Sequence, residues 1–350
     1  MNRLPIIQRY SIFVDLPVHS RLVTLHEGYT PLIPLPHIAN HLGGSFHLYA
    51  KYEGLNPTGS FKDRGMTAAI SEAVGRGAQT VICASTGNTA ASAAAYASRA
   101  GQKAVVLIPE GKVAAGKLAG AVAYGAQVIQ IAGSFDDALR MVVQISERHP
   151  IALVNSLNPY RLEGQKTAAF EICDELGKAP DWLCLPVGNA GNITSYWMGF
   201  KQYHEYKATG LPHILGVQAA GSAPLVLGHA VEHPETVATA IRIGRPARGE
   251  QALQAAEESG GKIIAVSDEQ ILEMQRALAS EGVWVEPASA AGLAGLAEEI
   301  RLGRFEPKGK CIVTVCTGHG LKDPDIIAKS MPAPQRIPAE LDALEELILP

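Results

Sequence analysis

The chain has 350 residues, of which 47% are hydrophobic and 18% are charged, and its formal net charge is −4. This length is enough to bury a large core and favours two domains over one. The slightly negative charge, without a cluster of Lys or Arg, argues against a nucleic-acid partner, and no apolar run approaches the roughly 18 residues of a membrane helix.

Short apolar runs alternate with helical stretches from about residue 46 onward. The expected strands are 46–52, 80–84, 104–108, 127–131, 151–154, 182–187, 214–218, 263–266, 283–285 and 311–316. The expected helices are 63–76, 88–100, 135–148, 161–177, 193–208, 267–281 and 288–301. Ser267 and Gln270 form a capping box at the start of one of these helices. Continuous apolar strands between helices predict an α/β fold with parallel sheets that are covered on both faces.

The same alternation predicts how the chain divides. We expect a smaller α/β domain at residues 53–158 and a larger α/β domain from residues 1–52 and 159–350, with a hinge where the smaller domain ends. Residues 220–262 have weak periodicity and predict a mobile or irregular segment. The C-terminal residues 339–349 have the pattern of a short amphipathic helix, whose apolar side chains need a surface on this chain or on a second subunit.

The chain has five cysteines, which are Cys83, Cys173, Cys184, Cys311 and Cys316. Because the number is odd and four of them have apolar neighbours, we expect reduced and mostly buried thiols. No pair has the spacing of metal ligands, so no metal site is expected. Together with the lack of an apolar signal core at the start of the sequence, this predicts a cytoplasmic location.

Residues 56–65 have the features of a turn that activates one lysine. Pro57 and Gly59 make the turn rigid, and we expect Ser60 to cap the helix that follows. Lys62 then lies in the first helical turn, where the positive end of the helix dipole disfavours its ammonium form. An ordinary lysine titrates near ~10.4, so a lysine that must form an imine needs such help. The alternative is a surface lysine after a capped turn.

Two further segments are strand–turn–helix junctions. Residues 83–91 and 183–192 each follow an apolar run and lead into a helix. Backbone N–H groups at such junctions bind anions, and in parallel sheets the junctions lie, like Thr317, beyond the carboxyl ends of strands. A nicotinamide dinucleotide site is rejected, because the Gly-x-Gly-x-x-Gly pattern is absent and Gln218 stands where an acid is needed. An N-cap with small residues behind it would account for the loop at 85–89 alone, and a mononucleotide or simple phosphate stays possible for the loop at 188–192. The lysine and both loops together indicate an aldehyde cofactor that carries a phosphate.

With these motifs the chain resembles the fold-type II pyridoxal-phosphate enzymes, and among them the threonine synthases, from Glu27 to about Lys322. The resemblance implies two three-layer α/β domains with mainly parallel sheets, pyridoxal 5'-phosphate in the cleft between them, and a homodimer. It also implies that Lys62, in the pattern Ser-Phe-Lys-Asp-Arg, forms the imine with the cofactor and later moves protons. Lys51 is the competing lysine, but it lies on an expected strand with no turn or dipole to activate it.

The resemblance assigns further residues to the cofactor. Asn88 would donate an amide N–H to the ring hydroxyl oxygen, and Thr317 would face the pyridine nitrogen. A threonine does not hold that nitrogen protonated as a carboxylate would, which suits elimination chemistry more than transamination. The cofactor phosphate would bind the loop of Gly188, Asn189, Ala190, Gly191 and Asn192.

The substrate would be held at its two ends. Its carboxylate would be surrounded by Ser85, Thr86 and Thr89. Asn155, Ser156 and Arg161, in a pattern that separates the threonine synthases from their relatives, would bind a phosphate ester together with Lys117. The alternatives are that Arg161 starts a helix and pairs with Glu163 or with solvent, and that Lys117 is an ordinary surface lysine.

We therefore expect a pyridoxal-phosphate-dependent carbon–oxygen lyase that converts O-phospho-L-homoserine and water to L-threonine and phosphate by β,γ-replacement. A serine/threonine dehydratase or a cysteine-synthase-like enzyme on the same scaffold, and a non-catalytic cofactor-binding homologue, are the alternatives. The roles of His319 and Glu286 stay open. So does the effect of Arg245-Pro246-Ala247-Arg248, where many relatives are expected to carry Asn-Pro-Ala-Ser.

Overall fold

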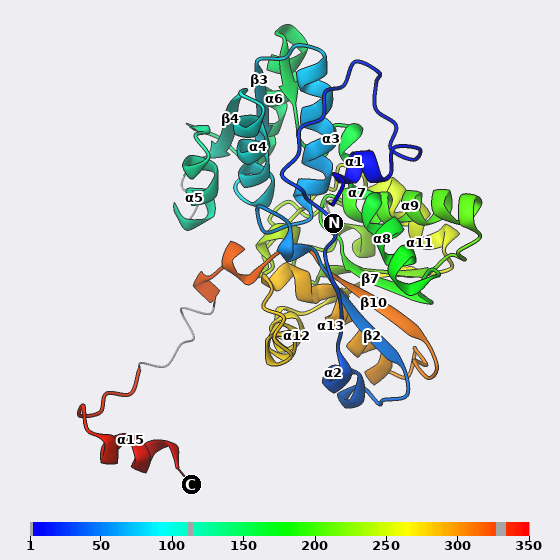
Figure 1. Ribbon diagram of the computed structural model, residues 1–350, viewed down its shortest axis with the longest axis vertical. Coiled ribbons are helices and arrows are strands. Elements are labelled where there is room, and N and C mark those ends of the chain that lie inside the picture. Colours follow the sequence, from blue (N-terminus) through cyan, green and yellow to red (C-terminus); the bar gives the residue numbers. More distant parts are fainter. Residues whose placement is uncertain (1–2, 111–114, 327–333, 350) are drawn as a thin grey trace.

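The computed structural model describes residues 3–110, 115–326 and 334–349, with the backbone alone at 115–117, and Figure 1 follows the chain through these elements. The strands are β1 Leu32–Pro34, β2 His47–Tyr52, β3 Thr80–Ala84, β4 Lys103–Pro109, β5 Gln127–Ile131, β6 Ile151–Leu153, β7 Trp182–Pro186, β8 His213–Ala219, β9 Lys262–Val266 and β10 Cys311–Cys316. The α-helices are α1 Ile6–Arg9, α2 Pro36–His41, α3 Lys62–Gly75, α4 Asn88–Arg99, α5 Ala115–Ala123, α6 Phe135–Arg148, α7 Tyr160–Gln165, α8 Thr167–Leu176, α9 Gly191–Lys207, α10 Pro224–Leu227, α11 Gly249–Glu258, α12 Asp268–Ser280, α13 Pro287–Arg301 and α15 Leu341–Ile348. Short 3-10 helices are η1 Glu53–Leu55, η2 Thr239–Ile241 and η3 Gly320–Lys322.

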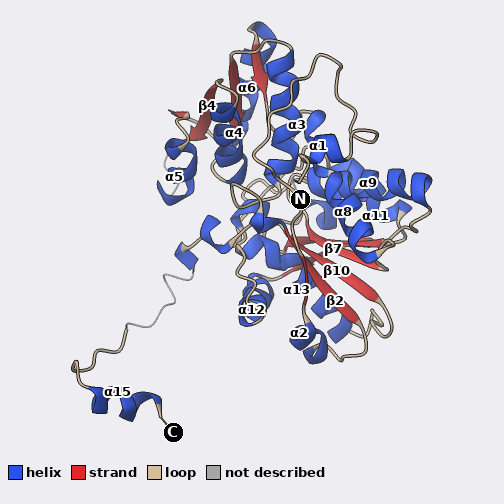
Figure 2. Ribbon diagram, in the orientation of Figure 1, coloured by secondary structure: helices blue, strands red, loops and turns tan. Residues whose placement is uncertain are grey.

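Six strands form one sheet in the order β1-β2-β10-β7-β8-β9, in which β1 is antiparallel to β2 and the other pairs are parallel. Helices lie against both faces of this sheet (Figure 2). Apolar residues of α2, α12 and α13 pack on one face, and those of α8, α9 and α11 pack on the other. Because both faces are buried, a central strand such as β7 is apolar at successive positions instead of alternate ones.

The other four strands form an all-parallel sheet in the order β5-β4-β3-β6. Helices α3, α4 and α5 cover one face of this sheet, and α6 covers the other. Each sheet is therefore the middle layer of a helix–sheet–helix sandwich. The predicted α/β fold, with mainly parallel sheets in three-layer arrangements, is confirmed.

Most of the predicted elements are confirmed, including the capping box in which Ser267 accepts from the backbone N–H of Gln270. The strand expected at 283–285 is wrong, because that segment makes only an isolated bridge between Val285 and His319 before α13 begins. The prediction of an irregular segment at 220–262 is wrong in part, because it contains the ten-residue helix α11 and the start of β9.

The helix predicted at 161–177 is interrupted at Lys166, which separates α7 from α8. The hydroxyl of Thr167 donates to the carbonyl oxygen of Gly164 at 2.6 Å, and such a side-chain bond competes with the helical ladder. Gly164 also packs directly on Arg64 of α3, so that α7 and α3 are in close contact. The interruption therefore lies where α7 meets the helix that begins with Lys62.

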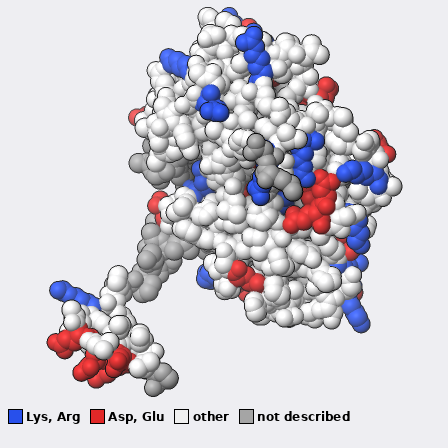
Figure 3. Space-filling view, in the orientation of Figure 1, with Lys and Arg blue, Asp and Glu red and all other residues white. Residues whose placement is uncertain are grey.

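The C-terminal helix predicted at 339–349 is confirmed as α15. Its apolar side chains, among them Leu341, Leu344 and Ile348, are exposed. Figure 3 shows acidic side chains gathered on this C-terminal segment, where α15 carries Asp342 in its first turn. Within the described residues, no helix combines the length and apolarity that crossing a bilayer requires.

Candidate functional site

A pocket lies where the carboxyl ends of strands from both sheets meet. From the four-stranded sheet it is lined by residues that follow β3 and β6, among them Ser85 and Ser156. From the six-stranded sheet it is lined by residues that follow β7 and β10, among them Gly188 and Thr317. Such crevices are where open parallel sheets bind ligands. Lys62, the first residue of α3, also lines this pocket.

The turn before Lys62 is closed differently from the sequence prediction. Ser60 does not cap α3, and its buried hydroxyl has no hydrogen-bond partner within the described residues. Instead, the carboxylate of Asp63 accepts from the backbone N–H and the hydroxyl of Thr58, each at 2.6 Å. The backbone N–H of Phe61 donates to the carbonyl oxygen of Thr317 at 2.9 Å. These bonds fix Lys62 at the start of the helix and beside the end of β10.

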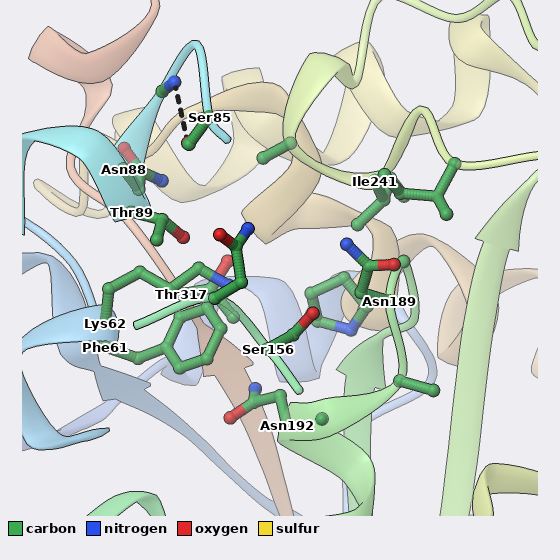
Figure 4. Close-up of a pocket in the computed structure, with 18 of the residues that line it drawn as sticks. Phe61, Lys62, Ser85, Asn88, Thr89, Ser156, Asn189, Asn192, Ile241 and Thr317 are labelled. Atoms are coloured by element: carbon green, nitrogen blue, oxygen red, sulfur yellow. Dashed lines mark hydrogen bonds between the residues drawn. The ribbon is translucent and has the colours of Figure 1, made fainter. Parts of the chain in front are cut away.

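The environment of Lys62 favours its neutral amine. Burial lowers the pKa of Lys62 to about 7, and the nearby positive charge of Arg161 contributes to the lowering, whereas Glu286 acts in the opposite direction. The amine lies over the ring of Phe61, 4.1 Å from the ring centroid. In Figure 4, Asn88 and Thr89 lie on the same side of the cavity as Lys62, and Asn189 lies across from them. A lysine with this pKa is a nucleophile at neutral pH.

The competing lysine, Lys51, has a structural role. Its amine on β2 is buried and donates to the carbonyl oxygen of Thr30 at 2.6 Å and to the carboxylate of Glu171 at 2.9 Å. It lies outside the lining of this pocket. Its amine is already bonded to these partners, so Lys62 is the better candidate for imine chemistry.

The loop from Gly188 to Asn192 connects β7 to the N-terminus of α9. None of the five backbone N–H groups from Gly188 to Asn192 donates a backbone hydrogen bond within the described residues. The side-chain nitrogen of Asn192 is also buried, without a partner in the described part of the chain. A side chain at Gly188 would place its Cβ 3.0 Å from the Cα of Ile241, so the backbone there is closely approached. Unpaired donors at a helix N-terminus suit a phosphate group.

Two hydroxyls meet where β10 ends. The hydroxyls of Thr317 and Ser289 lie 2.9 Å apart, and Ser289 also accepts from the backbone N–H of Gly318 at 2.8 Å. Thr317 lines the pocket and is buried. Its hydroxyl is therefore held in place by α13, which begins at Pro287.

Asn88 is tied to a buried acid. Its side-chain nitrogen donates to both carboxylate oxygens of Glu286, at 2.9 and 3.1 Å. Burial raises the pKa of Glu286 to about 7, although the bond from Asn88 opposes this shift. Glu286, whose role the sequence left open, thus fixes the orientation of the Asn88 amide inside the pocket.

The residues predicted for the substrate carboxylate lie together. Ser85, Thr86 and Thr89 all line the pocket. The hydroxyl of Ser85 accepts from the backbone N–H of Gly87 at 3.3 Å, which shapes the turn before α4 (Figure 4). Asn155 lines the pocket, but both ends of its amide are bonded to the backbone of Ala84 at 2.9 Å. It therefore orients the end of β3, and direct contact with a substrate stays a prediction.

Arg161 is a buried cation without an acidic partner within the described residues. Its side chain is 2% exposed, its Nε has no hydrogen bond, and one terminal nitrogen makes a 3.4 Å contact with the carbonyl oxygen of Val154. Burial lowers the pKa of Arg161 to about 10, and the charge of Arg248 adds to the lowering. Arg161 lies in the first turn of α7, as the alternative held, but its pairing with Glu163 is wrong, because Glu163 pairs with Lys166. A buried guanidinium of this kind is suited to binding an anion.

Several pocket residues were missed at the sequence level, among them Phe61, Gln165, Ile241, Arg242 and Lys322. Lys322 is a second amine in the site, and burial lowers its pKa as well. Among the side chains predicted from the sequence, that of Lys117 lies outside the described residues. His319 does not line the pocket, and it packs between the rings of Tyr52 and Trp284.

Comparisons with known proteins identify the family of this chain. The family model described as "Pyridoxal-phosphate dependent enzyme" matches residues 23–318. The threonine synthase of Synechocystis is 59% identical over 91% of this chain and 84% of its own length, and that of Halalkalibacterium halodurans is 57% identical over 91% and 90%. The solved structure of tomato threonine deaminase isoform 2 has the same fold, with a TM-score of 0.72 at 22% identity over 87% of this chain and 83% of that one.

Proposed function

The chain belongs to the pyridoxal-phosphate-dependent enzymes, and within them to the threonine synthases, and from this premise we propose the role of each pocket residue. Its reaction converts O-phospho-L-homoserine and water to L-threonine and phosphate, which makes it a pyridoxal-phosphate-dependent lyase. When bound, the cofactor supplies an electron sink for negative charge on the substrate carbons. The protein's own residues bind, orient and transfer protons.

Lys62 is the residue that holds the cofactor aldehyde and then carries protons. Its pKa of about 7 allows the amine both to accept and to give up a proton near neutral pH. The backbone N–H groups from Gly188 to Asn192 would hold the cofactor phosphate. The hydroxyl of Thr317 would face the ring nitrogen, and Asn88, anchored by Glu286, would face the ring hydroxyl.

The pocket would bind the substrate at two groups, its carboxylate and its phosphate. Ser85, Thr86 and Thr89 present hydroxyl and backbone donors for its carboxylate. The guanidinium of Arg161, with the hydroxyl of Ser156 beside it, would bind the phosphate that leaves and neutralise its charge. Burial of the pocket walls keeps these interactions strong.

A single observation carries this proposal: a buried Arg161 without a carboxylate partner in the described part of the chain lies close enough to lower the pKa of Lys62. A pocket that combines an imine-forming amine with an unpaired guanidinium suits a phosphorylated amino acid. Serine and threonine, the substrates of a dehydratase, have no group that needs this charge.

The test is an assay of the purified, cofactor-loaded protein on O-phospho-L-homoserine, in which phosphate and threonine are both quantified. We expect equal amounts of the two products, no product from Lys62→Ala, and a strongly raised KM for Arg161→Met. Ammonia and a keto acid from serine or threonine, without threonine formation, would make the protein a dehydratase and overturn the proposal.

We further propose that residues 53–158 form the smaller domain, that the protein is a homodimer, and that it is cytoplasmic. The separate four-stranded sheet within 80–153 supports the domain division.

The exposed apolar side chains of α15 support a second subunit, and free cysteines support a reducing compartment. Analytical ultracentrifugation tests the homodimer, which a single monomeric species at micromolar concentration would exclude.

A further inference from the structure

Arg248 connects a distant part of the chain to the segment that carries Ser156. It precedes α11 in the six-stranded half of the molecule. Its Nε donates to the carbonyl oxygen of Ser156 at 3.2 Å, and a terminal nitrogen donates to the carbonyl oxygen of Leu157 at 3.3 Å. The fork of one guanidinium thus holds two successive carbonyls of the segment that follows β6.

The neighbouring residue binds the Gly188–Asn192 loop of the pocket. The backbone N–H of Ala247 donates to the side-chain oxygen of Asn189 at 3.4 Å. Residues 247 and 248 therefore bridge the Gly188–Asn192 loop and the segment of Ser156. Both residues belong to the sequence Arg245-Pro246-Ala247-Arg248, whose effect was open at the sequence level.

The guanidinium groups of Arg248 and Arg161 lie close together. The charge of Arg248 lowers the pKa of Arg161, which requires the two guanidinium groups to be near each other. Within the described part of the chain, neither group is hydrogen-bonded to a carboxylate. Two like charges that are partly removed from water repel each other, and an anion near both would offset this repulsion.

A phosphate ester is the anion that fits this arrangement. It carries up to two negative charges and offers several oxygens to donors that approach from different directions. Arg161 lines the pocket, and so does Ser156, whose hydroxyl has no hydrogen bond within the described residues and is available to the same anion. Arg248 fixes the backbone on which that hydroxyl is placed.

We propose that Arg248 is a positioning residue for the phosphate of the substrate. It holds Ser156 in place and adds a second positive charge near Arg161. This inference rests on the proposed function, since it concerns the same substrate. It goes beyond that function because it assigns part of the affinity to a residue outside the pocket lining, at a position where this chain departs from the expected Asn-Pro-Ala-Ser.

The test compares Arg248→Met, which removes both the fork and the charge, with Arg248→Lys, which keeps the charge alone. Arg245→Met is the matched control, because Arg245 is an exposed arginine of the same loop without a hydrogen bond within the described residues. Three quantities are measured on the cofactor-loaded proteins: KM and kcat for O-phospho-L-homoserine, the inhibition constant of inorganic phosphate, and the rise in Tm that phosphate causes.

For Arg248→Met we expect KM and the phosphate inhibition constant to rise about tenfold, as for the loss of one charge-assisted interaction, with kcat changed less than about twofold. Arg248→Lys should lie between Met and the natural residue, and Arg245→Met should match the unchanged protein. The rise in Tm with phosphate should shrink in Arg248→Met. A merely structural role would instead lower Tm without phosphate and leave both constants unchanged.

Unchanged KM and unchanged phosphate inhibition in Arg248→Met would overturn the inference. If the unchanged protein formed no threonine, the proposed function would have failed, and the rise in Tm with phosphate would still decide the role of Arg248. If Arg248→Met did not fold, Arg248→Lys would decide it: constants equal to those of Arg245→Met would contradict the role of the fork.

Discussion

At the scale of single residues, the site depends on how burial and neighbouring charges shift the pKa values of its side chains. Burial and the charge of Arg161 lower the pKa of Lys62 to about 7, and burial raises the pKa of Glu286 to about 7. The sequence predicted Lys62 from its turn and helix position, and the structure places it in the pocket. The sequence did not reveal the role of Arg161 in activating it, because the two residues approach each other only when α7 packs on α3.

The pKa of Lys62 predicts how its reactivity depends on pH. In the cofactor-free protein the amine loses its proton at about pH 7, so its reductive methylation should rise through that pH, whereas ordinary lysines react with a midpoint near ~10.4. Arg161→Met removes a like charge and should move the midpoint upward. Peptide mass spectrometry after labelling at a series of pH values measures it.

The same shift has a consequence for stability, whose sign follows from proton binding. Between about pH 7 and ~10.4 the unfolded chain keeps the proton that folded Lys62 has lost, so stability rises with pH across this window in the cofactor-free protein. A labelling midpoint near that of ordinary lysines would contradict both statements.

At the scale of elements, the packing of α3 on α7 brings Lys62 close to Arg161. Gly164 of α7 lies so close to α3 that a Cβ there would be 1.8 Å from the carbonyl oxygen of Arg64. Gly65 of α3 is also restricted, with a Cβ that would be 2.8 Å from the carbonyl oxygen of Arg161. Only glycine permits this approach, which sets the distance between Lys62 and Arg161.

Gly164→Ala is predicted to separate the two helices. The added methyl group meets backbone, which does not rotate away, so the free energy of unfolding should fall by about 3 kcal/mol. KM for the phosphorylated substrate should rise as well. Denaturant unfolding and steady-state kinetics measure the two effects.

Gly120→Ala in α5 is the matched control, because its Cβ would meet only the side chain of Ala91, at 3.4 Å. That variant should be neutral or slightly more stable, since alanine favours a helix over glycine by about 1 kcal/mol. Equal stability of the two variants would show that the α3–α7 contact does not need glycine.

The elements also show where sequence patterns suffice and where they do not. The parallel strands of both sheets were predictable because a short, continuous apolar run between two helices is typical of a buried parallel strand. The three-residue edge strand β1, which is antiparallel to β2, was not predicted. The break at Lys166 was not, because it depends on the hydroxyl of Thr167 and on a neighbouring helix. Ser60 likewise has the residue type of a cap, but Asp63 and Thr58 close the turn in its place.

At the scale of the whole molecule, a buried ion network joins elements that are far apart in the chain. Arg64 of α3 pairs with Glu53 and Glu171, each at 2.6 Å, and Lys51 of β2 pairs with Glu171 at 2.9 Å. All four side chains are nearly or fully inaccessible to solvent. The arginine of the Ser-Phe-Lys-Asp-Arg motif is therefore structural, which the pattern alone did not indicate.

Arg64→Met should destabilise the protein more than any surface variant, because it leaves two buried carboxylates with one cation. We expect a loss of about 3–5 kcal/mol in the free energy of unfolding, measured with denaturant. Arg301→Met, which removes an exposed pair with Glu298, is the control and should stay close to the unchanged protein.

The network also predicts sensitivity to acid. Burial alone would raise the pKa of Glu171, but the charges of Arg64 and Lys51 lower it overall. Its contribution to stability is therefore present above the unfolded pKa near ~4.3 and is lost as the pH falls further. In Arg64→Met this loss on acidification should be smaller, and an unchanged acid profile would contradict the role of the pair.

The most direct test of the account is the identity of the lysine that holds the cofactor. The protein loaded with pyridoxal phosphate is reduced with borohydride and digested, and the modified peptide is identified by mass spectrometry. We predict one modified peptide, which contains Lys62, while Lys51 and the second pocket amine, Lys322, stay unmodified. Modification of Lys322 in place of Lys62 would contradict the assignment of the pocket's chemistry to the start of α3.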